Sequence, residues 1–76
     1  MIELDITTVS MPILAPVKGT YRVESAQENT SDVLIIKGPR AWSLSPNTAI
    51  EFSLESGEKF NLASVIGTQR VRHGVK

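Results

Sequence analysis

The stretch Ala49–Leu62, AIEFSLESGEKFNL, carries the strongest structural signal in the sequence. Alternation of apolar and polar residues with a period of two is typical of a strand with one buried face, and an intervening glycine indicates a turn. The stretch therefore predicts a β-hairpin. The apolar residues that alternate in this way are Ile50, Phe52 and Leu54 before the turn, and Phe60 and Leu62 after it.

The register of this hairpin is predicted from the parity of its apolar residues. A loop of two or four residues would place Phe52 opposite Asn61 and turn one strand inside out. A three-residue loop, Glu55–Gly57, pairs Phe52 with Phe60 instead. That loop also leaves Gly57 at the position where a type I turn closed by a bulge requires positive φ. We therefore expect Phe52 and Phe60 to form a cross-strand pair on the buried face.

The rest of the chain shows more strand and loop of the same kind, and no segment has a helical stripe of useful length. Residues 32–37 contain the run VLII, which is apolar on both faces and predicts the most interior strand. We expect a single domain over residues 1–76 with an all-β fold, either a small antiparallel β-sandwich or an open β-barrel of about five to six short strands. The further strands are expected at residues 2–6, 20–25 and 40–44.

Two segments interrupt this pattern. Residues 10–19 contain two prolines in an apolar run and predict an arm, an edge strand or a loop, because proline donates no hydrogen bond to a ladder. Residues 67–76 carry three cations and no acid, and predict a basic C-terminal tail that is either solvated or a last edge strand.

The chain is short, and a domain of 76 residues buries only about 60% of the surface that its unfolded form exposes. Because there is no cysteine, neither disulfides nor thiolate metal sites can reinforce the core. This thin core favours stabilisation by a partner. No apolar run approaches the length of a membrane span, and Glu3 and Asp5 interrupt any signal peptide. We expect a protein that is cytoplasmic, or in the virion if viral, that is not secreted and that has no membrane partner.

The sequence offers little for catalysis. His73 is the only histidine and lies among cations near the end of the chain, which predicts a solvated residue rather than a member of a catalytic triad. With one histidine, no cysteine and no clustered carboxylates, we predict no metal site. No glycine motif for phosphate is present either. The sequence therefore predicts a non-enzymatic protein with no catalytic residues and no cofactor.

Three segments are candidates for binding. In the loop around Trp42, an aromatic ring beside cations could anchor a protein or stack a nucleobase, although Trp42 could simply fill the core. The proline segment could reach into a neighbouring subunit or pair at its sheet edge, or lie over its own sheet. The basic tail could attract nucleic acid or an acidic patch on another copy, or remain solvated.

From these segments we predict two sets of site residues. Those that bind a protein partner are Met11, Pro12, Ile13, Leu14, Pro16, Arg40 and Trp42. Those that contact nucleic acid or an acidic partner are Lys37, Arg40, Arg70, Arg72 and Lys76.

These features favour a structural or interaction protein that acts as a small β subunit of a larger assembly. Its most concrete form is a virion or capsid-associated accessory protein, such as a decoration or joining subunit. The partners would be proteins, either further copies of the chain or other subunits, and we expect an oligomeric or lattice-bound state. One alternative is a small nucleic-acid-binding β-barrel, which ranks second because the chain outside the tail is mildly acidic. The other is a small regulator or inhibitor that binds by strand addition.

Overall fold

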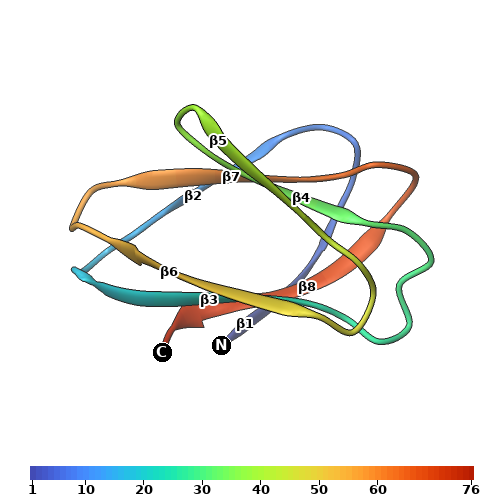
Figure 1. Cartoon of the computed structure of the whole chain (residues 1–76), viewed down its shortest axis with the longest axis horizontal. Coiled ribbons are helices and arrows are strands. Elements are labelled where there is room, and N and C mark those ends of the chain that lie inside the picture. Colours follow the sequence, from blue (N-terminus) through green and yellow to red (C-terminus); the bar gives the residue numbers. More distant parts are fainter.

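The computed structural model describes all residues 1–76 and contains eight strands in two layers (Figure 1). Sheet A has the strand order β1-β8-β3-β6, sheet B has the order β2-β7-β4-β5, and every pairing is antiparallel. The all-β prediction is confirmed, with eight strands rather than about five to six. No helix in the structure is both long and apolar enough to span a membrane. The strands are β1 (Ile2–Ile6), β2 (Met11–Leu14), β3 (Gly19–Ser25), β4 (Val33–Lys37), β5 (Arg40–Leu44), β6 (Ala49–Leu54), β7 (Lys59–Ser64) and β8 (Gln69–Val75).

The strand pairing follows a simple order. Strand β4 pairs with β5, β3 with β6, β2 with β7 and β1 with β8. The chain is therefore doubled back at the β4–β5 hairpin and then rolled into two sheets, which is the connectivity of a jelly roll. Two further pairings, β3 with β8 and β4 with β7, complete the sheets.

The core lies between the sheets, where alternate residues of most strands point inward. Each large apolar side chain that is fully buried stabilises the fold by about 1.5–3 kcal/mol. The Tyr21 hydroxyl, at the margin of this core, donates a hydrogen bond to the carbonyl of Val17 at 3.1 Å. The largest fully buried side chains are Phe60, Ile6, Ile35, Leu54, Leu62, Val23, Val33 and Val71.

The predicted hairpin over residues 49–62 is wrong as a strand pairing. Strand β6 pairs with β3 in sheet A, whereas β7 pairs with β2 and β4 in sheet B. Gly57 lies in the turn between them with a φ of 86°. Phe52 and Phe60 do contact, with ring centroids 5.2 Å apart and rings at 89°, but they meet across the two layers. Parity alone identifies which residues face inward, and it does so equally well for a ladder and for two facing sheets.

Of the two alternatives for residues 67–76, the strand is the one found, but residues 69–75 form β8 between β1 and β3, in the middle of sheet A rather than at its edge. His73 is 7% exposed and lies opposite Ile2 on one neighbour and Val23 on the other. The segment is polar overall only because Arg70 and Arg72 alternate with its buried residues and point outward. An interior strand with a cationic outer face therefore resembles a basic tail in the sequence.

Within the proline segment, residues 11–14 form strand β2 at the edge of sheet B, and residues 15–18 form the turn that leads to β3. Ala15 directs both backbone groups toward the β7 side, with its N–H bonded to Glu58 at 2.8 Å and its carbonyl to Gly57 at 2.9 Å. Because these groups alternate along an antiparallel strand, Ile13 bonds toward β7 as well and Pro12 faces the free edge. Proline is tolerated there because no ladder requires its missing N–H. It also removes a donor that strand addition at this edge would use.

Candidate interaction surfaces

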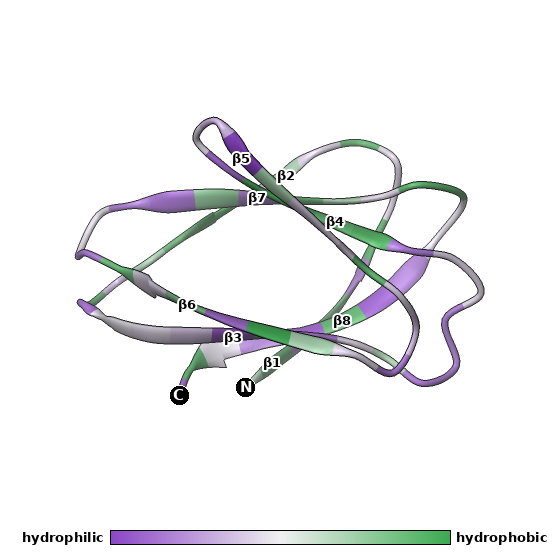
Figure 2. Ribbon diagram, viewed as in Figure 1, coloured by the Kyte–Doolittle hydropathy of each residue, from purple (hydrophilic) through white to green (hydrophobic).

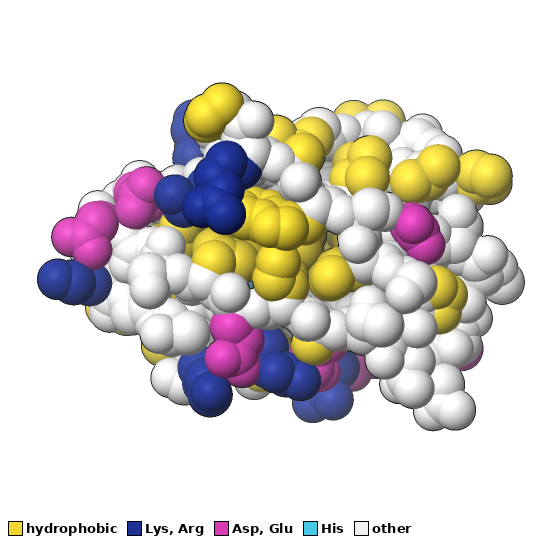
Figure 3. All heavy atoms as spheres, in the orientation of Figure 1, with side chains coloured by type: hydrophobic (Ala, Val, Ile, Leu, Met, Phe, Trp, Pro, Cys, Tyr) yellow, Lys and Arg dark blue, Asp and Glu magenta, His cyan; other side chains and the backbone are white.

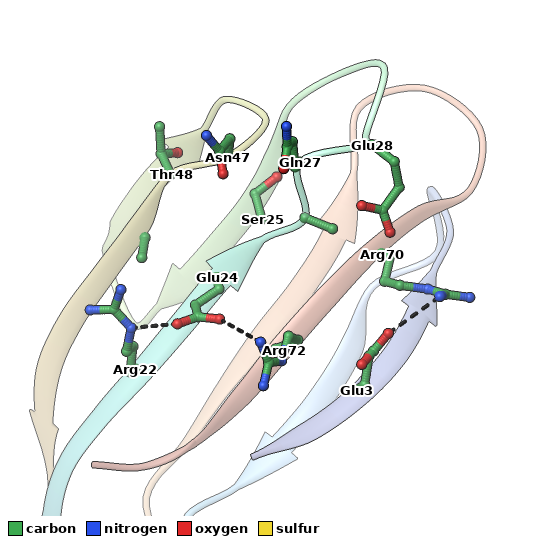
Figure 4. Close-up of a pocket in the computed structure, with 12 residues that line it drawn as sticks. Glu3, Arg22, Glu24, Ser25, Gln27, Glu28, Asn47, Thr48, Arg70 and Arg72 are labelled. Carbon is green, nitrogen blue, oxygen red and sulfur yellow. Dashed lines mark hydrogen bonds and ion pairs between the residues drawn. The ribbon is translucent and has the colours of Figure 1, made fainter.

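The outer face of sheet A is covered by charged side chains that pair with one another. The strand register sets opposite charges side by side, with Arg22 opposite Glu51 and Arg72 opposite Glu24. Figure 4 shows part of this network, in which Arg22, Glu24 and Arg72 form a continuous chain across β3 and β8. The N–O distances lie between 2.6 and 3.6 Å for the pairs Arg22–Glu24, Arg22–Glu51, Lys76–Glu51, Arg70–Glu3, Arg70–Asp5 and Arg72–Glu24.

This pairing shifts pKa values in the direction expected for ion pairs. A hydrogen bond from Lys76, with a second from Arg22, lowers the pKa of Glu51. The hydrogen bond from Arg22 likewise lowers the pKa of Glu24. Because all of these groups lie near solvent, each pair contributes little to stability, and their main effect is to hold the side chains in place.

A polar groove of about 470 Å³ lies at one end of this network, bordered by the turns that carry Gln27 and Thr48 (Figure 4). Most charged side chains that line it form ion pairs, such as Arg22 with Glu24, whereas Glu28 has no ion-pair partner. No group of three histidine, cysteine, aspartate or glutamate side chains in the structure could hold a metal ion. The groove therefore presents mostly paired charges rather than a set of free acids and bases.

The outer face of sheet B is apolar and contains no ion pair. Leu34 lies between Ala63 and Ser43 of the neighbouring strands, and Ile36 lies between two further outward residues. Leu14 is 63% exposed, whereas Leu34 and Ile36 are half-buried. We call this surface the apolar face. Its outward positions are Pro12, Leu14, Leu34, Ile36, Ala41, Ser43, Asn61 and Ala63, of which Ala63 is buried.

In Figure 2, strands β2 and β4 of sheet B are largely hydrophobic, and β3 and β8 of sheet A carry hydrophilic stretches, as do parts of β5 and β7 in sheet B. In the space-filling view, charged side chains gather along the lower border over sheet A, and hydrophobic ones predominate along the upper border over sheet B (Figure 3). The two outer surfaces of the sandwich therefore differ in chemistry as well as in position.

Two charged residues lie at opposite ends of the apolar face, and neither has an ion-pair partner among the contacts of the chain. Lys59, the first residue of β7, points outward beside Leu14. Asp32 accepts a hydrogen bond from the Ser43 hydroxyl at 2.7 Å, and its carbonyl bonds the N–H of Val65 just past the end of β7. The length of β7 thus separates the two charges by about 20 Å, at roughly 3.3 Å per residue.

Trp42 lies at the open side of the sandwich, where β5 and β6 belong to different sheets and do not pair. Its half-buried ring stacks on Phe52, with centroids 5.6 Å apart and planes within 11°. The guanidinium carbon of Arg40 lies 4.9 Å from the centroid of the same ring. Hydrophobic side chains are visible between β5 and β6 in Figure 3. A nucleobase that stacked on Trp42 would have to displace one of these two neighbours.

The structure separates the residues that were predicted to bind a protein partner. Pro12 and Leu14 lie on the apolar face, Met11 and Ile13 of the same strand face β7 and the interior, and Pro16 follows in the β2–β3 turn. Arg40 and Trp42 lie on β5, at the opposite edge of sheet B. Of the predicted nucleic-acid contacts, four have carboxylate partners within the chain, and Arg40 has none. The four are Lys37 with Glu58, Arg70 with Glu3 and Asp5, Arg72 with Glu24, and Lys76 with Glu51.

Sequence reasoning missed the centre of the apolar face. Leu34 and Ile36 were expected in the interior because their strand is apolar on both sides, a pattern that presumes a packed layer on each side of the sheet. This chain forms only two layers, so both residues lie on an outer surface.

The chain matches no protein-family model, and neither curated proteins nor solved structures give a significant match. A function can therefore be argued only from the chemistry of the surfaces described above.

Proposed function

We propose that this protein is a non-enzymatic interaction protein that serves as a small β subunit of a larger assembly and binds its protein partner through the apolar face. The observation that carries the proposal is a sheet surface without ion pairs, on which Leu14 of β2 is exposed and Leu34 and Ile36 of β4 are half-buried. Residues of β7 lie between Leu14 and the two β4 residues. Exposed apolar surface that gathers on one face marks interaction sites in soluble proteins. The ion-paired face of sheet A would stay in contact with solvent.

In its most concrete form, the proposal is a virion or capsid-associated accessory protein, such as a decoration or joining subunit. The jelly-roll connectivity supports this form by analogy, because viral capsid domains commonly use that architecture. An analogy of fold does not by itself assign a function, so the apolar face remains the stronger argument.

A regulator that binds by strand addition is a second candidate, supported by the free edge of β6. The N–H of Ser25 on β3 bonds the carbonyl of Thr48, so alternate residues of β6 bond to β3. The N–H and carbonyl groups of Ala49, Glu51 and Ser53 consequently face outward, and no proline blocks them. Nucleic-acid binding ranks behind both candidates, because most of the cations it requires are neutralised by carboxylates of the chain.

The test is co-sedimentation of a tagged copy expressed in its native host. We expect the wild-type protein to sediment with particles far larger than its own 8.3 kDa. This association should persist after nuclease treatment. Leu14→Glu should release it, because a carboxylate on the apolar face is costly to bury. The matched control is Val17→Glu, at a residue that is 52% exposed in the β2–β3 turn, and it should remain bound. Wild-type protein found only as free chains would overturn the proposal.

A further inference from the structure

We infer that the occupant of the apolar face is the same face of a second copy of this chain, related by a two-fold axis that runs across the strands. This inference names the occupant of the apolar face and rests on the proposed function, with the dimer as the unit that enters the larger assembly. In this arrangement the two β7 strands lie over one another in opposite directions. Lys59 of each copy then meets Asp32 of the other.

Self-complementarity is the condition for a two-fold interface, because each patch must be able to bind itself. The apolar face meets this condition in its charges, with one unpaired cation and one unpaired anion at opposite ends. A two-fold axis across the strands reverses the second copy end to end and brings the cationic end of one over the anionic end of the other. Both ion pairs form in a single dimer.

The shape of the face also suits this packing. Its outward positions include small or flat side chains, Ala41, Ser43 and Ala63, around the larger Leu34 and Ile36. Two sheets pack face to face at about 10 Å when their side chains can interdigitate in this way. The interface would extend the layered architecture that the chain already uses in its own core.

Other arrangements of two copies are less well matched. A two-fold axis parallel to the strands would set the Lys59 end of one copy on the Lys59 end of the other, and like charges across an interface are unfavourable. Edge-to-edge pairing at β2 is opposed by Pro12, which presents no donor at that edge. The outer face of sheet A has its charges satisfied within the chain. Among face-to-face arrangements, the charge pattern therefore selects one face and one direction.

The test is sedimentation equilibrium of the purified full chain over a range of concentrations. We expect the wild type to reach twice the 8.3-kDa chain mass. Lys59→Glu and Asp32→Lys should each weaken dimerisation by about tenfold or more, because each reversal creates two like-charge contacts. The double variant K59E/D32K should recover the wild-type affinity, since it restores both pairs in the opposite sense. Lys18→Glu and Glu28→Lys are controls with the same charge changes on exposed residues away from the face.

Circular dichroism would establish that each variant is folded. If D32K is not folded, Asp32→Asn replaces it, and a smaller loss of dimer affinity is expected. A wild type that remains monomeric would overturn the inference, as would a dimer that ignores the single reversals or a folded double variant that fails to recover. If the monomeric wild type still co-sediments with large particles, the proposed function stands with a different partner. If neither dimer nor particle is found, both are wrong.

Discussion

The two outer faces of this sandwich are each built on four strands of the same chain, yet one presents charged side chains to solvent and the other presents apolar ones. On sheet A, residues such as Arg22 and Glu24 form a connected set of ion pairs. On sheet B, Leu14, Leu34 and Ile36 form an apolar surface. The buried cluster between the sheets contains none of these outward residues. The difference therefore separates the residues that build the fold from those that are available to a partner.

The largest effect is expected from a matched pair of substitutions on adjacent residues of β4. Ile35 is 0% exposed and points into the core, and Ile36 points out to the apolar face. Ile35→Ala should lower the free energy of unfolding by about 2–5 kcal/mol, because it removes buried methyl groups and leaves a cavity. Ile36→Ala should cost only about 1 kcal/mol, since its side chain is partly solvated already. Denaturant unfolding at low protein concentration measures both.

The same two substitutions should affect self-association in the reverse order. Ile36→Ala should weaken self-association more than Ile35→Ala does at concentrations where both variants are folded. Equal stability losses at the two positions would mean that the outward side of β4 is packed as tightly as the core, and the contrast between the faces would then be wrong.

Sequence patterns predicted the inward-facing residues better than the strand neighbours. Alternation placed Phe52 and Phe60 toward the interior, and both pack there. The same alternation could not show that β6 and β7 lie in different sheets, because pairing depends on contacts between distant segments. The apolar face was hidden for a related reason: only the number of layers decides whether the outer side of VLII is core or surface.

A second prediction separates the inner and outer sides of β8 by pH. Burial, with the nearby N-terminal amino group, lowers the pKa of His73 below its ordinary value of 6.5. The fold therefore favours the neutral ring, and the stability that this ring contributes is present above about pH 6.5 and is lost as the pH falls through the folded pKa. On the outer side, the pKa of Glu51 is lowered. The stability that its carboxylate contributes is therefore lost only at a pH below the ordinary value of 4.5.

When unfolding is measured from about pH 7 to about pH 3, the free energy of unfolding should therefore decline in two separate pH ranges. His73→Gln should remove the upper decline and leave the lower one. A single decline confined to the carboxylate range, unchanged by H73Q, would show that His73 titrates as freely in the fold as in the unfolded chain.

The smallest effect is expected on the outer face of sheet A itself. Arg22 joins Glu24 at 2.6 Å and Glu51 at 2.9 Å, so Arg22→Met breaks two links of the network at once. Lys18→Met is the matched control, because Lys18 has one contact, at 3.9 Å, with the exposed Glu55. We expect a small fall in Tm for Arg22→Met, none for the control, and a loss of the difference at about 1 M salt, where exposed charges are screened. Self-association should be unchanged in both variants. A loss of dimer in Arg22→Met would instead place the partner on sheet A and reverse the roles assigned to the two faces.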